Sequence, residues 1–207
     1  MDSLQLAELL CARICHDLSG PVGAAAAGAE LFEDMDGVPD PETLGLVAGA
    51  AAGAAQRLKF FRAALGPAAS APQSTVALRE LIEAYLGTQV SAASPGIALS
   101  WPAAPTALPG AGARLLLNLV LLAKDALPRG GRIRIDAADG RPQVIAHGEP
   151  ASLSDEARQV LVEGLPPSGP RGAQAELARI LADRDGGKLK VSITPDGLAL
   201  SVGASGV

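Results

Sequence analysis

The spacing of apolar residues divides the chain into two regions. Up to about residue 65, apolar positions recur every three or four residues, which is typical of amphipathic helices. One helix is predicted over residues 3 to about 35, with its apolar stripe at Leu10, Ile14, Leu18, Pro21 and Ala25. A second is predicted from Pro41 to about Leu65, with a heptad pattern at Leu44, Val47, Ala51, Ala54, Leu58, Phe61 and Leu65.

A short turn separates the two predicted helices. Residues 36–41 read Asp-Gly-Val-Pro-Asp-Pro, in which Asp40 is a suitable N-cap and Pro41 suits the first helical position. A connection of this length predicts an antiparallel helical hairpin over residues 1–66.

Two helices alone cannot bury apolar stripes of this length. We expect two hairpins to pair across a two-fold axis as a four-helix bundle, which makes the protein a homodimer. The alternative is that the second half of the same chain covers the hairpin. Glycines at positions 45, 49 and 53 mark a face where backbones can approach closely. The positions expected inside the shared core are Ala51, Ala54, Leu58 and Phe61.

The second region alternates helical and strand patterns. Residues 66–75, rich in Pro, Ala and Ser, predict a linker before it. Helices are predicted over residues 78–89, 111–127, 155–164 and 173–183, and strands over residues 97–101, 132–137, 143–146, 189–193 and 198–202. Turns are predicted at 139–140 and 195–197. We therefore predict an α+β protein whose second domain, residues 76–207, is a two-layer α/β sandwich with about five strands.

Composition and charge narrow the possible partners. Apolar residues make up 48% of the chain and aromatic residues only 2%, so the core must consist mainly of Ala, Leu and Val. A net charge of -5 without a basic run argues against nucleic-acid binding. The longest apolar run, residues 115–123, is too short to cross a membrane, and the N-terminus lacks a signal-peptide pattern. We expect a cytoplasmic protein without a membrane partner.

Cys11 and Cys15 share one face of the first helix, beside His16. Two thiols and a histidine that points elsewhere make a poor zinc site. We therefore expect buried, reduced cysteines and no metal.

His16 lies off the apolar stripe of the first helix. It is two residues from both Ile14 and Leu18, which turns it about 200° away from them and predicts an exposed side chain rather than a core histidine. A neutral imidazole offers a nitrogen lone pair that can attack phosphorus. Asp17 can orient the ring or accept its proton, and Arg13, one turn earlier, can meet a phosphoryl group on His16. The alternative is that Arg13 and Asp17 form a solvated surface pair.

The residues after His16 also carry information. Pro21 has no N–H and its ring presses on the carbonyl of Asp17, so we expect a kink there. Gly20 leaves space for an approaching partner. Leu18, Pro21 and Val22 are candidates for an apolar docking patch, although for Leu18 core packing is the preferred interpretation.

The run His-Asp-Leu-Ser-Gly-Pro from His16 to Pro21 resembles the H-box of sensor histidine kinases, and the element order of the second domain resembles their ATP-binding domain. Asn118 lies in a segment that resembles the N-box, where the family uses two asparagines to hold magnesium and phosphates. The second position here is Leu122, which cannot bind a cation that requires oxygen ligands. Ala146 stands where the G1 box has its adenine-binding aspartate.

The glycine-rich phosphate loop of that family is reduced in this chain. It corresponds to residues 169–172, Gly-Pro-Arg-Gly, followed by Gly186 and Gly187, which are too few glycines for a phosphate cradle. A hairpin with a phosphorylatable histidine, joined to an ATPase-like domain without ATP chemistry, resembles the ChpT-type histidine phosphotransferases over essentially the whole chain.

This resemblance implies a cytosolic dimer that relays a phosphoryl group between aspartates of receiver domains, in hybrid kinases and response regulators, through phospho-His16. His16, Asp17 and Arg13 are the expected catalytic residues, no cofactor is expected, and the receiver is expected to supply magnesium. The alternatives are a sensor histidine kinase with an atypical nucleotide site and a non-catalytic dimeric scaffold. His147 is interpreted as a surface residue at a strand end rather than a second catalytic group.

Overall fold

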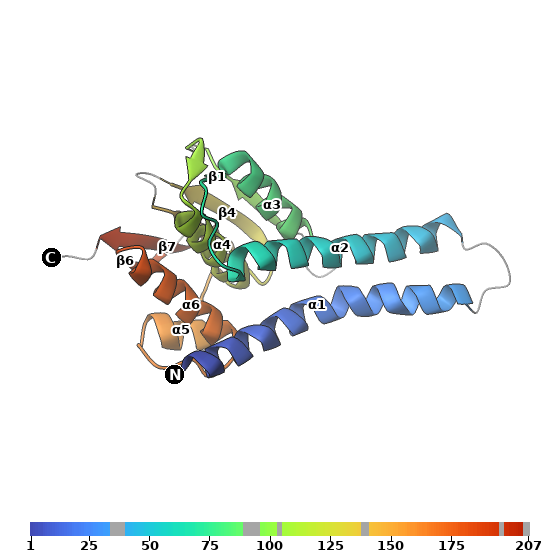
Figure 1. Cartoon of the computed structure of the whole chain (residues 1–207), viewed down its shortest axis with the longest axis horizontal. Helices are drawn as coiled ribbons and strands as arrows, with labels where there is room; N and C mark the ends of the chain where they lie inside the picture. Colours follow the sequence, from blue (N-terminus) through green and yellow to red (C-terminus); the bar gives the residue numbers. More distant parts are fainter. Residues whose placement is uncertain (34–39, 89–95, 103–104, 138–140, 195–196, 205–207) are drawn as a thin grey trace.

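A computed structural model describes residues 1–33, 40–88, 96–102, 105–137, 141–194 and 197–204. Two long helices, α1 (Ser3–Glu33) and α2 (Pro41–Leu65), run antiparallel and project from a layer of helices and strands (Figure 1). The Asp40 carboxylate accepts hydrogen bonds from the N–H groups of Glu42 and Thr43, both at 2.9 Å, and Pro41 begins α2. The predicted hairpin and N-cap are confirmed, while the predicted turn over 36–39 lies outside the described residues.

Helix α1 continues through Pro21 without a break. Because proline has no N–H, the carbonyl of Asp17, four residues earlier, has no partner within the helix. The axis of α1 changes direction along its length (Figure 1). Farther along, α1 and α2 approach closely at Gly28, where a Cβ atom would collide with the side chain of Val47.

The second domain contains four helices among the described residues, and their bounds are α3 (Thr75–Gly87), α4 (Gly110–Asp125), α5 (Asp155–Leu161) and α6 (Pro170–Arg184). Its five-stranded sheet has the order β2-β4-β5-β7-β6. The strands are β2 (Ile97–Ser100), β4 (Gly131–Asp136), β5 (Gln143–His147), β6 (Gly187–Thr194) and β7 (Gly197–Ala204). The β2–β4 pair is parallel and the other pairs are antiparallel, and α3, α4 and α6 cover one face (Figure 1).

A short ladder departs from the sequence prediction. Strand β1 (Gln73–Ser74), inside the predicted linker, pairs with β3 (Ala107–Leu108), and neither had been predicted. Two-residue strands carry no alternation that a pattern could reveal. The predicted turns at 139–140 and 195–196 lie outside the described residues.

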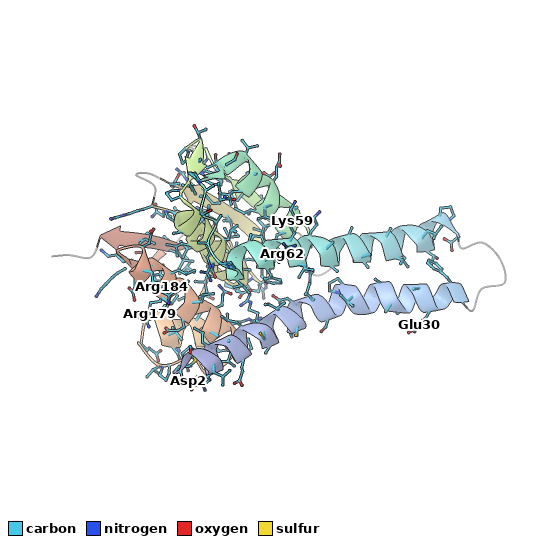
Figure 2. The ribbon with its side chains drawn as sticks, in the orientation of Figure 1. Asp2, Glu30, Lys59, Arg62, Arg179 and Arg184 are labelled. Atoms are coloured by element: carbon cyan, nitrogen blue, oxygen red, sulfur yellow. The ribbon has the colours of Figure 1, made fainter. Side chains whose placement is uncertain are left out.

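Helix α4 is the centre of the core. Every residue from Leu115 to Ala123 is buried, and α4 contacts α2, α3, α6 and the sheet. Side chains are dense where the base of the hairpin meets the second domain and mostly short along the far half of the hairpin (Figure 2). The Ala- and Gly-rich sequence of that far half accounts for the difference.

The position of Phe61 corrects the predicted heptad seam. Phe61 is buried by the second domain of its own chain, with its ring centroid 5.9 Å from that of Tyr85 in α3. The neighbouring Phe60 stacks on Tyr85 at 4.1 Å. The base of α2 therefore belongs to the core of the second domain, and the stripe available to a partner ends before Phe61.

Asn118 of α4 joins three helices through its buried amide. Its Nδ2 donates hydrogen bonds to the carbonyls of Ala64 in α2 at 2.7 Å and Arg114 at 2.8 Å. Its Oδ1 accepts one from Gln174 of α6 at 2.6 Å. The residue that resembles an N-box asparagine thus satisfies buried polar groups, which are costly to leave unpaired.

Candidate functional site

His16 projects from α1 with 86% of its side chain exposed, which confirms its predicted position off the apolar stripe. Its Nδ1 lies 3.0 Å from Asp17 Oδ1. An ionised carboxylate can only accept hydrogen bonds, so this contact places the ring proton on Nδ1. The lone pair is then on Nε2, the nitrogen able to act as a nucleophile.

Arg13 is not the exposed neighbour that the sequence suggested. Only 4% of its side chain is exposed, with Nη1 2.6 Å from Asp125 Oδ2 and Nε 3.7 Å from Asp17 Oδ2. The interpretation as a solvated surface pair is therefore wrong for Arg13. The face of α1 that carries Arg13 and Asp17 packs against the second domain, and His16 lies at the edge of that contact.

Asp125 and Lys124 are site residues that the sequence analysis missed. Asp125 ends α4, is 8% exposed, and its Oδ1 lies 2.9 Å from Lys124 Nζ. Alternating charges therefore run from Lys124 through Asp125 and Arg13 to Asp17, which contacts His16. The sequence does show this pair of charges at the end of an otherwise apolar helix. Their partner, Arg13, lies more than a hundred residues earlier in the chain, so residue spacing could not indicate the contact.

Both members of the buried pair remain charged at neutral pH. Burial alone would lower the pKa of Arg13, but attraction to Asp125, a hydrogen bond to it and attraction to Asp17 raise that pKa above its usual value. Burial alone would raise the pKa of Asp125, but Lys124 and Arg13 hold it below its usual value.

Arg57 of α2 holds the carbonyl that Pro21 leaves without a helical partner. Its Nη1 donates to the Asp17 carbonyl at 2.7 Å. Its Nε donates to Thr88 Oγ1 at 3.1 Å and its Nη2 to the Thr88 carbonyl at 2.7 Å. Thr88 is the C-cap residue of α3, so this guanidinium connects α1, α2 and α3.

A groove of about 600 Å³ brings these groups together. Its lining residues are Ala12, Arg13, His16, Asp17, Gly20, Arg57, Lys124, Asp125, Glu156, Pro170 and Arg171. Glu156 Oε2 accepts hydrogen bonds from the N–H groups of Arg171 at 2.9 Å and Gly172 at 3.0 Å, in the first turn of α6. A Cβ atom at Gly169 would lie 2.6 Å from Oε2 of the same carboxylate.

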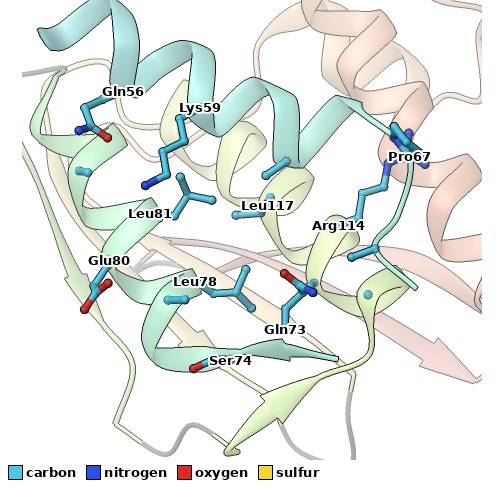
Figure 3. A pocket seen from close by; sticks show the side chains of 16 residues that line it. Gln56, Lys59, Pro67, Gln73, Ser74, Leu78, Glu80, Leu81, Arg114 and Leu117 are labelled. Carbon is cyan, nitrogen blue, oxygen red and sulfur yellow. The ribbon is translucent and has the colours of Figure 1, made fainter. Parts of the chain in front are cut away.

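A second cavity of about 440 Å³ lies between α2, α3 and α4. Gln56 and Lys59 reach into it from α2, and Leu78 and Leu81 of α3 form part of its wall (Figure 3). Neither histidine lines it. His147 ends β5, half-buried, and does not line the His16 groove. We therefore place the candidate site in the His16 groove.

The cysteines differ from their prediction in burial. Cys11 and Cys15 are free, as predicted, but both are exposed. The face of α1 that packs on the second domain includes Arg13, and this leaves the cysteines outside it.

Across the described parts of the chain, no three His, Cys, Asp or Glu side chains are grouped as metal ligands. No helix within those parts is long and apolar enough to cross a membrane.

The positions that resemble nucleotide-binding boxes belong to the core. Leu122 and Ala146 are both buried. The amide of Asn118 is engaged by Ala64, Arg114 and Gln174. In the first turn of α6, the backbone N–H groups that a phosphate would need already donate to Glu156.

Comparison with known proteins gives consistent matches. The family model described as Histidine phosphotransferase C-terminal domain matches residues 78–197. The chain is 31% identical over 209 residues to Protein phosphotransferase ChpT of Brucella abortus (strain 2308), covering 97% of this chain and 96% of that protein. A bacterial phosphotransferase solved at 1.7 Å has a TM-score of 0.80 and 28% identity, covering 98% and 97% of the two chains. The predicted fold class is confirmed.

We predict that Asp125→Asn lowers the free energy of unfolding at pH 7 by about 3–5 kcal/mol, because the buried Arg13 would lose the nearer of its two countercharges. The folded pKa of Asp125 lies below its unfolded value of about 3.9. Its contribution is therefore complete above the unfolded pKa and is lost as pH falls through the folded pKa. Urea denaturation between pH 7 and pH 3 should show a weaker acid dependence in the variant.

The double variant Arg13→Met, Asp125→Leu provides the control. Replacing both charges by apolar side chains should restore most of the lost stability. Equal stability of Asp125→Asn and the wild type would contradict the buried pair.

Proposed function

This chain belongs to the histidine phosphotransferase family, and we propose that it relays phosphoryl groups between aspartates of receiver domains through phospho-His16, without binding ATP. The observation that carries the proposal is the exposed imidazole of His16, with its Nδ1 beside Asp17. The proposed partners are receivers of hybrid kinases and response regulators.

The proposed reaction is a reversible transfer. The Nε2 lone pair attacks the phosphorus of a receiver's aspartyl phosphate, a P–N bond forms, and the P–O bond to the aspartate breaks. The electron pair of that bond returns to the aspartate carboxylate. The ring becomes positively charged, and Asp17, as acceptor of the Nδ1 hydrogen bond, stabilises that charge.

A second receiver takes the phosphoryl group by the reverse step. The receiver is proposed to supply magnesium, which would neutralise the phosphoryl oxygens. No cofactor of this chain enters the proposal. Arg13 is proposed to act as the support of Asp17 rather than as a direct contact of the phosphoryl group, since its guanidinium is directed at Asp17 and Asp125.

Independence from ATP is supported by the residues at the positions that resemble the nucleotide-binding boxes of histidine kinases. Leu122 offers no oxygen ligand, and Ala146 offers no acceptor for adenine. The carboxylate of Glu156 would repel a phosphate at the start of α6. The kinase alternative would require each of these arrangements to change.

A cytoplasmic homodimer is the proposed working form. The hairpin exposes large apolar side chains, which are Val22, Leu31, Leu44 and Leu46 in its far half and Leu58 nearer its base. Such a surface on a single chain indicates a protein contact, and pairing of two hairpins would bury it. Near His16, exposed Val22 and half-buried Pro21 and Leu18 form the proposed apolar part of the receiver contact.

We predict that His16→Ala abolishes labelling by a phosphorylated receiver and leaves the fold intact, because the lost side chain is largely exposed. Acid-labile phosphate on the chain should be measured after mixing. The control is His147→Ala, which removes the other of the two histidines and should retain labelling. Undiminished labelling of His16→Ala would exclude His16 as the acceptor, and an unlabelled wild type would favour the scaffold alternative.

We predict no ATP binding at micromolar concentrations, with or without magnesium. The physical reason is the missing oxygen ligand at Leu122 together with the occupied first turn of α6. Calorimetric titration of the wild type is the measurement. Magnesium-dependent heat of binding would favour the histidine kinase alternative.

We predict that Ala51→Glu converts a dimer into a monomer. Ala51 is exposed in the single chain, so the charge is harmless there, but in a shared seam an unpaired charge costs several kcal/mol. Light scattering at matched concentration gives the mass, and circular dichroism gives the helix content. Gln56→Glu, which adds the same charge to another face of α2, should remain dimeric. A monomeric wild type would contradict the dimer, and a dimeric Ala51→Glu would contradict the seam.

A further inference from the structure

Two arginines of the hairpin contact Asp17 at separate points, and each is bonded in turn to the second domain. Its main-chain carbonyl accepts a hydrogen bond from Arg57, which is itself bonded to Thr88 at the end of α3. Its carboxylate faces Arg13, whose charge is balanced by Asp125 at the end of α4. The residue that contacts His16 is therefore linked, through Arg57 and Arg13, to the ends of α3 and α4.

The contact with Arg57 exists because of Pro21. In an uninterrupted helix the carbonyl of residue 17 would bond to the N–H of residue 21, and proline has none. Two nitrogens of the Arg57 guanidinium donate to Thr88 and the third donates to this carbonyl. Three hydrogen bonds therefore fix the plane of the guanidinium. The backbone at Asp17 is thus bonded to Arg57 of α2, and through it to Thr88, instead of to its own helix.

The contact with Arg13 is an ion pair with the carboxylate itself, without a hydrogen bond. One oxygen of Asp17 faces the buried guanidinium at 3.7 Å, and the other lies 3.0 Å from Nδ1 of His16. The attraction of Arg13 for the first oxygen favours the orientation in which the second accepts the ring proton. Arg13 is paired in turn with Asp125. Movement of Asp125 would therefore disturb the contact of Arg13 with Asp17, and with it the contact of Asp17 with His16.

We infer that Arg57 and Asp125 are positioning residues for the phosphoacceptor: they hold Asp17 so that His16 keeps its proton on Nδ1 and its lone pair on Nε2. The expected effect on the rate of transfer rests on the proposed function. The expected effect on the tautomer of His16 does not, because it concerns the protein before any transfer. Neither residue contacts the reacting atoms. The second domain acts on Asp17 through Thr88, which is bonded to Arg57, and through Asp125, which is paired with Arg13.

The tautomer of His16 is the direct readout. Long-range ¹H–¹⁵N correlation spectra above pH 8 distinguish an Nδ1–H ring from an Nε2–H ring, and this chain has only two histidines to assign. His147→Gln removes one of them. We expect the Nδ1–H form of His16 in the wild type, and a shift toward the Nε2–H form in Arg57→Met and in Arg13→Met, Asp125→Leu.

Rapid-mixing phosphotransfer from a labelled receiver is the second readout. Arg57→Met should lower the maximal transfer rate constant by about tenfold or more, with little change in the half-saturating receiver concentration. Arg57→Lys, which keeps a donor for the Asp17 carbonyl, should recover part of the rate. In an Asp17→Asn background the Arg57→Met change should have little further effect, because it acts through Asp17.

The control is Arg62→Met, which removes the same charge from an exposed position on α2 and should change neither readout. A folded Arg57→Met protein with the wild-type tautomer and transfer rate would overturn the inference. Additive losses in the Arg57→Met, Asp17→Asn pair would also overturn it. If no wild-type transfer is found, the proposed function fails, and the tautomer spectra still decide the positioning role.

Discussion

The buried pair of Arg13 and Asp125 determines how the hairpin joins the second domain. Both side chains are buried, and an unpaired buried charge costs several kcal/mol. Sliding α1 by one turn would separate Arg13 from Asp125 and leave each without the other. The pair therefore selects one register of α1 against α4, and that register places His16 at the groove edge and Asp17 beside Arg57.

The elements of this fold were predictable because they depend on local patterns. Apolar spacing located both hairpin helices, the main strands and the exposed side of α1 that carries His16. The burial of Arg13 and the roles of Asp125 and Arg57 were not predictable, because each depends on a partner in a distant segment. Phe61 shows the same limit, since its heptad spacing suits a bundle seam, and only the contact with Tyr85 shows that the chain's own second domain covers it.

The second domain resembles a nucleotide-binding domain in its element order, but its corresponding positions contribute to stability. Asn118 satisfies carbonyl and amide groups between three helices. Glu156 neutralises the start of α6 with a carboxylate from the same chain. These hydrogen bonds join α2, α4, α5 and α6, and α1 packs against α6 of the same group of helices.

Pro21 has a mechanical consequence for the hairpin. The inner part of α1 is joined to α4 through Arg13 and Asp125 and to α2 through the Asp17 carbonyl and Arg57, whereas the outer part packs along α2. Between them, one helical hydrogen bond is absent by covalent structure, so bending there costs less than in the rest of the helix. The outer arm can therefore change its angle while the phosphoacceptor turn keeps its shape. Two arms joined in a bundle would then present their histidines at variable separation but with constant local geometry.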